Sequence, residues 1–221
     1  MAFSRGPKIV TDGLVLALDA ANPRSYPGSG TTWYDLSGNG YNGTLLNGTS
    51  FSNGNSGYLS FDGTNDRISF TQFTHTTAWT ISYWFYHDGE SDDMTIGEHS
   101  TNPNRFYHRD TGTSYKLRVH NNDNISVQDM ALGDIRNQWA HLAYSMDDSS
   151  GTIKGWVNGE QVLDTSTGYS ATFVVDSWGR VYPNDVYHWK GRVGPVLIYN
   201  RQITTPEYKQ IYNATRSRFG L

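Results

Sequence analysis

The sequence predicts an all-β protein, a two-sheet antiparallel sandwich of the jelly-roll type with one C-terminal helix. Three observations predict it. Glycine supplies 23 of the 221 residues, and Asn-Gly or Asp-Gly pairs recur along the chain. Such pairs favour tight turns between short strands. The segments between these turns alternate polar and apolar residues, and aromatic residues make up 14% of the chain, which contains no cysteine. A sandwich of this length is commonly one domain.

The predicted strands can be placed in order along the chain. A short apolar run at residues 14–19 is the first, and residues 58–61 and 67–70 flank a turn that contains Asp62-Gly63. Residues 78–89 alternate, so Trp79, Ile81, Tyr83 and Phe85 should face one way and Thr80, Ser82, Trp84 and Tyr86 the other. Residues 138–147 and 151–163 follow as antiparallel strands, the second broken by an Asn158-Gly159 hairpin turn.

One helix is predicted, at residues 203–218. Thr204 suits the N-cap and Glu207 lies three residues later, which is a capping box, while Pro206 falls in the first turn. Tyr208, Ile211, Tyr212 and Thr215 form one stripe that should face the sandwich.

The chain divides into an N-terminal arm, residues 1–10, and a single domain, residues 11–221. The arm carries Arg5 and Lys8 and is expected either to dock on a neighbouring molecule as an anchor or to fold back on its own domain. The first residues lack the apolar core of a signal peptide, and no apolar run is long enough to span a membrane. A formal net charge of −4 argues against nucleic-acid binding.

A set of motifs in a fixed order resembles a known family. The set comprises "GLVLALDAANPRSY", "WYDLSGNGYNGTLLNG", "YLSFDGTNDRISF", "TISYWFY", "QWAHLAYSMDDSSGTIKGWVNGEQV" and "WKGRVGPVLIYNRQITTPEYKQIYNA". Together they resemble the laminin-G-like branch of the concanavalin A-like jelly rolls over nearly the whole chain after residue 10. The opening and closing motifs are most similar to structural proteins of tailed phages, especially those that infect marine cyanobacteria. This resemblance implies a place on the virion surface, in a capsid decoration, tail fibre or baseplate.

Enzymatic activity is not expected. Laminarinase-type glycosidases share the implied fold and need two carboxylates about 5 Å apart. The spacing of the acidic residues matches no such pair, and the only glutamates are Glu90, Glu98, Glu160 and Glu207. No Gly-x-Ser-x-Gly, His-Glu-x-x-His or phosphate-loop motif occurs either.

No cofactor or metal residue is assigned, although a structural calcium stays open as an alternative. The resemblance implies oxygen ligands from the first and last strands, where Asp19 ends the first strand. Gly194 stands at the position where relatives often carry an aspartate, which counts against such a site. An acidic loop with Asp88, Glu90, Asp92 and Asp93 is a second option for calcium, or simply a solvated hairpin.

Aromatic residues in polar surroundings are the candidate glycan-binding or interface residues. Trp84 and Tyr86 lie on the predicted outer face of one strand, and a polar stretch near the end of the chain adds four more: Trp178, Tyr182, Tyr187 and Trp189. Aromatic side chains outside a core often belong to binding surfaces. The alternative is that most of the tryptophans pack in the core.

The expected function is therefore that of a non-enzymatic virion structural protein, displayed on the particle and assembled in the host cytoplasm. Its expected partners are other virion proteins, and it is expected to form a homo-oligomer. The alternative is a lectin-like module that attaches to host-surface glycans, and a cellular lectin-like domain is a third possibility.

Overall fold

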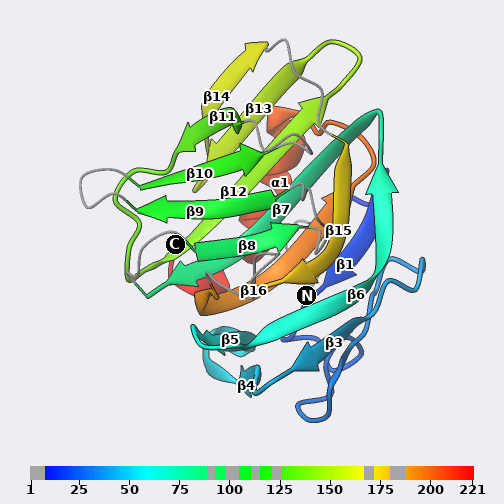
Figure 1. Cartoon of the computed structure of the whole chain (residues 1–221), viewed down its shortest axis with the longest axis vertical. Coiled ribbons are helices and arrows are strands. Elements are labelled where there is room, and N and C mark those ends of the chain that lie inside the picture. The colour runs from blue at the N-terminus through cyan, green and yellow to red at the C-terminus, as the bar shows by residue number, and fades with distance from the viewer. Residues whose placement is uncertain are drawn as a thin grey trace, which may run out of the picture.

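The computed structural model describes residues 8–88, 93–97, 105–110, 115–120, 126–166, 172–179 and 188–221. Two eight-stranded antiparallel sheets pack face to face, as the sequence predicted (Figure 1). Sheet A has the order β14-β13-β12-β7-β16-β5-β4, with β1 also paired to β16, and sheet B has the order β11-β10-β9-β8-β15-β6-β3-β2. Within the described residues, no helix is long and apolar enough to cross a membrane.

The strands of sheet A are β1 (Leu14–Leu18), β4 (Ser50–Ser52), β5 (Tyr58–Asp62), β7 (Ala78–His87), β12 (Trp139–Asp147), β13 (Thr152–Val157), β14 (Glu160–Ser166) and β16 (Lys190–Tyr199). Those of sheet B are β2 (Thr32–Trp33), β3 (Gly43–Leu46), β6 (Arg67–His75), β8 (Asp93–Gly97), β9 (Arg105–Asp110), β10 (Tyr115–His120), β11 (Ser126–Ala131) and β15 (Phe173–Trp178). The helical elements are α1 (Thr205–Thr215) and two 3₁₀ turns, η1 (Gly54–Ser56) and η2 (Arg216–Phe219).

The main core lies between the two sheets. The alternation predicted for β7 is confirmed, because Trp79, Ile81, Tyr83 and Phe85 all belong to this core. Phe106 of β9 and Phe173 of β15 meet Trp79 from the opposite sheet, with ring centroids 5.4 and 4.5 Å away. The period of two along each strand therefore separates one buried face from one outer face.

The hairpin between β13 and β14 forms where the sequence predicted it. Asn158 and Gly159 have φ angles of 47° and 96°. This left-handed pair matches the right-handed twist of the flanking strands.

Strand β16 changes its partner along one edge. Its first half pairs with β5 and its second half with β1, and the register shifts between Val193 and Val196. Pro195 lies at this irregularity. Proline has no backbone N–H, and at an irregular position no hydrogen bond between the strands is lost through its absence.

The outer face of sheet A is covered by α1 and η2, which lie on the side away from sheet B (Figure 1). The predicted capping box is present, since the Thr204 side chain accepts from the Glu207 N–H and the Glu207 carboxylate accepts from the Thr204 N–H. A bidentate pair with Arg201, at 2.6 and 3.0 Å, lowers the pKa of Glu207 to about 2. Tyr208 and Ile211 of the predicted stripe are buried against the sheet.

Candidate functional site

Trp84 does point to the outer face of sheet A, as predicted, but it is only 1% exposed. The expectation that it is free to bind a partner is wrong, because α1 and η2 cover it. Its indole stacks on Phe219 with ring centroids 4.1 Å apart and also packs against Tyr212. Its N–H donates to Thr215 Oγ1 at 2.7 Å. A sequence pattern marks the outer face of a strand but not the helix that returns to cover it.

Trp178 and Trp189 are buried as well, both with 0% exposure. They belong to the core between the sheets, where Trp178 meets Tyr83 edge-on and Trp189 packs against Phe61. Their prediction as binding residues is therefore wrong, and the alternative of core packing holds for them. Tyr182 and Tyr187 lie outside the described residues.

Tyr86 is partly exposed, and it lies within an aromatic patch on the part of sheet A next to η2. We define the aromatic patch as Tyr58, Tyr86, Trp139 and Arg192, of which Trp139 is buried and the other three are partly exposed. Tyr58 and Tyr86 meet Trp139 edge-on, with ring centroids 5.5 and 5.9 Å from it. The guanidinium carbon of Arg192 lies 4.1 Å from the centre of the Tyr86 ring and 5.7 Å from that of Tyr58.

Sheet register brings the patch together. Tyr86 lies opposite Arg192 on one side and opposite Trp139 on the other. Arg192 in turn lies opposite Ser60 of β5, two residues from Tyr58. Side chains directly opposite on neighbouring strands share a face and come within contact distance.

Polar groups surround the aromatic patch. Arg192 Nη2 lies 3.8 Å from Asp88 Oδ1, and both side chains remain about one-third exposed, at 34% and 28%. Trp139 Nε1 donates to Asn55 Oδ1 at 3.1 Å. Flat rings, a stacked guanidinium, a carboxylate and an amide at one surface are the groups that bind the apolar face and the hydroxyls of a neutral polar ligand.

Sequence reasoning found Tyr86 but missed Tyr58, Trp139 and Arg192. The four residues of the aromatic patch are spread over 135 positions, from Tyr58 to Arg192, on four strands. The one available signal was their alternation, which assigns each to an outer face but cannot say which strands are neighbours.

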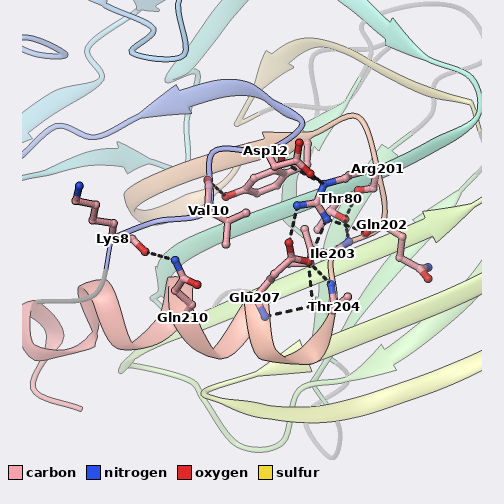
Figure 2. A network of polar contacts seen from close by, with 11 residues as sticks. Lys8, Val10, Asp12, Thr80, Arg201, Gln202, Ile203, Thr204, Glu207 and Gln210 are labelled. Atoms are coloured by element: carbon pink, nitrogen blue, oxygen red, sulfur yellow. Dashed lines mark hydrogen bonds and ion pairs between the residues drawn. The ribbon is translucent and has the colours of Figure 1, made fainter.

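The described end of the predicted arm folds back on its own domain. The Lys8 carbonyl accepts from Gln210 Nε2 at 2.7 Å, and the Val10 carbonyl accepts from the Tyr199 hydroxyl at 3.0 Å (Figure 2). Val10 is buried with α1 and β16, whereas the Lys8 ammonium points away from the helix. Arg5 lies outside the described residues.

A network of polar contacts continues this attachment toward the start of α1 (Figure 2). Arg201 Nε donates to the Asp12 carbonyl at 3.1 Å while its guanidinium holds Glu207. Thr80 Oγ1 of β7 donates to the Arg201 carbonyl and accepts from the Ile203 N–H. Both ends of the described chain are therefore tied to the same face of sheet A.

Two of the residues considered for calcium, Asp19 and Gly194, are in contact with other side chains. Asp19 receives a bidentate pair from Arg218, at 2.9 and 3.1 Å. A Cβ on Gly194 would lie 2.9 Å from both Phe219 and Trp84, so an aspartate does not fit there. Of the acidic loop, Asp88 pairs with Arg192, Glu90 and Asp92 lie outside the described residues, and only the backbone of Asp93 is described. No cluster of three or more His, Cys, Asp or Glu side chains suited to a metal occurs among the described residues.

Two of the four glutamates are described, and each forms an ion pair. Glu207 binds Arg201, and Glu160 Oε1 lies 3.9 Å from Lys209 Nζ. Glu90 and Glu98 lie outside the described residues.

A buried chain of hydrogen bonds ties α1 to the sheet. Ser82 Oγ lies 3.0 Å from His141 Nε2, and His141 Nδ1 lies 3.3 Å from the Tyr208 hydroxyl. The Tyr208 hydroxyl also accepts from the Gly159 N–H. Burial lowers the pKa of His141 to about 3 and raises the pKa of Tyr208, so both groups are neutral at pH 7.

The two packed antiparallel sheets define a jelly-roll sandwich. The chain belongs to the concanavalin A-like lectin/glucanase superfamily, whose Laminin_G_3 model matches residues 53–207. The search among curated proteins gave no significant match.

Solved structures share this fold at low sequence identity. Domain 4 of AbnA, an extracellular arabinanase from Geobacillus stearothermophilus in complex with arabinotriose, is 15% identical with a TM-score of 0.67, over 90% of this chain and 98% of that domain. The ligand-binding domain of botulinum neurotoxin serotype D in complex with N-acetylneuraminic acid is 11% identical with a TM-score of 0.69, over 92% of this chain. This chain covers only 51% of that domain, and about half of the other botulinum binding domains as well.

Proposed function

We propose that this protein is a non-enzymatic, lectin-like module that binds a glycan with the aromatic patch. The observation that carries the proposal is the arrangement around Tyr86, where two partly exposed tyrosine rings, packed on the buried Trp139, and a stacked guanidinium meet beside a carboxylate. A sugar ring stacks its C–H face on an aromatic ring, and its hydroxyls bond to neighbouring charged and amide groups. The fold is shared with a domain solved with arabinotriose and with one solved with N-acetylneuraminic acid, which supports a saccharide as the ligand class.

A glycan array followed by calorimetry on the best saccharide tests this function. We expect Tyr86→Ala and Arg192→Gln each to weaken binding by roughly tenfold or more, because each removes part of the stacking surface. Tyr34→Ala is the matched control, since Tyr34 is 46% exposed and lies outside the aromatic patch. Equal binding by wild type, Tyr86→Ala and Arg192→Gln would contradict the proposal, as would loss of binding in Tyr34→Ala alone.

We further propose that the module is a structural protein on the surface of a phage particle, as a capsid decoration or a tail, fibre or baseplate component. The ordered motifs that resemble tailed-phage structural proteins favour this setting. A particle carries many copies of such a protein, so a weak single glycan contact gains strength by multivalency.

Co-sedimentation with particles that lack this protein tests the virion role. We expect saturable binding by the full chain and a large loss on deletion of residues 1–7, which leaves the docked Lys8 and Val10 in place. The Tyr86→Ala variant should bind particles normally and lose only glycan binding. Absence of saturable binding by the full chain would contradict the virion role without affecting the glycan proposal.

A further inference from the structure

A cavity of about 240 Å³ lies under the N-terminal segment, by which we mean residues 8–11, between α1 and the outer face of sheet A. Its floor is formed by Ser82, Trp84 and His141, and α1 contributes Ile211 and Thr215. The remaining lining residues come from the N-terminal segment, β1, the loop after it and β16: Ile9, Thr11, Leu14, Ala17, Leu18, Asp19, Asn22, Leu36, Pro195 and Leu197. Thr11 and Leu36 are exposed, so the cavity reaches the surface.

The volume is large enough for an organic molecule. A cavity of about 150 Å³ lined by Leu, Ile and Phe stays dry and binds benzene or xenon. The space here is larger, and its walls are mostly aliphatic. Packing inside a folded protein is otherwise close, so an open space of this size lined by apolar side chains is able to accept an apolar molecule.

The polar atoms at the floor of the cavity are already bonded to one another. Ser82 bonds to His141, and the Trp84 N–H donates to Thr215. Thr215 Oγ1 in turn donates to the Ile211 carbonyl at 3.1 Å. A ligand with hydroxyl groups would leave those groups unpaired when it entered, at a cost in affinity.

The charge of the lining is also balanced. Asp19 is the one carboxylate among the lining residues, and Arg218 holds both of its oxygens. Burial keeps His141 neutral at pH 7. A charged ligand would therefore lose its hydration without gaining a counter-charge.

The N-terminal segment closes one side of the cavity through Ile9 and Thr11. Two hydrogen bonds hold this segment in place. The Lys8 carbonyl accepts from Gln210 of α1, and the Val10 carbonyl accepts from Tyr199 of β16. The contacts of one short segment thus close this side of the cavity.

We propose that this cavity is a binding site for a small, uncharged, apolar molecule of about six to ten carbon atoms, the size class set by comparison with the benzene-sized cavity. The site is separate from the aromatic patch, and the proposal is independent of glycan binding. The two sites differ in chemistry, because the charged side chains at the aromatic patch remain about one-third exposed, whereas polar groups that line the cavity are bonded to one another or to Arg218.

Titration of the full chain with toluene, followed by ¹⁵N-NMR, tests the site, with benzoate as the charged probe of similar shape. We expect saturable shifts at residues of β1 and α1 with toluene, with a dissociation constant on the order of 1 mM, and none with benzoate. Non-saturable shifts with toluene, or equal binding of benzoate, would overturn the proposal.

Filling the cavity distinguishes this site from surface adsorption. Ala17→Leu adds bulk inside the cavity, and we expect it to weaken toluene binding by roughly tenfold. Ala131→Leu is the matched control, because Ala131 is exposed on β11. If Ala17→Leu does not fold, Thr11→Trp at the opening of the cavity replaces it. Thr74→Trp, at an exposed position of β6, is then the control. Unchanged toluene binding in the folded cavity variant would overturn the proposal.

Discussion

Acidification from pH 7 to pH 4.5 is expected to destabilise the folded protein by about 2 to 3 kcal/mol through His141 alone. His141 is fully buried, and its pKa in the folded state is about 3 because burial disfavours the charged ring. His108 acts in the same direction. It lies between the sheets, and its pKa is lowered well below the ordinary value, first by burial and then by the neighbouring His87.

The sign follows from proton linkage. In the unfolded chain a histidine has a pKa of about 6.5, so it binds a proton as the pH falls below that value. The folded state leaves His141 neutral until about pH 3. The unfolded state therefore binds more protons between pH 6.5 and 3, and stability is lost across that window as the pH falls. Glu207 contributes only later, between its unfolded value of 4.5 and its folded pKa of about 2.

Urea denaturation at pH 7, 6, 5 and 4.5 measures this effect. We expect a slope of up to about 1.4 kcal/mol per pH unit for each buried histidine. His141→Gln should be less stable at pH 7, because it loses bonds to Ser82 and Tyr208, and should show a flatter pH dependence. A free energy of unfolding that stays constant from pH 7 to pH 4.5 would contradict the neutral burial of these rings.

Replacement of Trp84 by alanine is expected to lower the free energy of unfolding by about 3 to 5 kcal/mol. The indole is 1% exposed, stacks on Phe219 at 4.1 Å and donates to Thr215. Its removal leaves a void under α1 and abolishes the hydrogen bond from the indole N–H to Thr215 at the end of the helix. Thermal or urea denaturation gives the direct measurement.

Tyr86→Ala is the matched control for this loss. Tyr86 lies two residues further along β7, on the same face, but is partly exposed, so its removal should cost about 1 kcal/mol. The expected pattern is a stability defect at Trp84 and a binding defect at Tyr86. A stable Trp84→Ala variant that has lost glycan binding would show instead that Trp84 is accessible to ligand.

Part of the candidate site could be predicted from the sequence. Alternation along β7 placed Tyr86 on an outer face, and the ring remains partly exposed in the fold. The same alternation placed Trp84 on that face too, yet Trp84 is covered. Two residues with the same pattern thus differ in exposure, because exposure depends on where the C-terminal helix lies.

The sequence by itself determined the local structure. The period of two in β7, the Asn158-Gly159 turn and the Thr204–Glu207 capping box each depend on interactions within a few residues, and each formed as predicted. The motif order also indicated the family.

Only the tertiary structure decided which outer residues meet and which are covered. Arg192 reaches Tyr86 because β16 pairs with β7, and Trp139 reaches it because β12 pairs with the other edge of β7. The helix α1, which follows β16 in the chain, covers Trp84, and a cavity remains beneath the N-terminal segment. Neighbours in a sheet are chosen by long-range packing, so residues far apart in the chain form a site that no local pattern encodes.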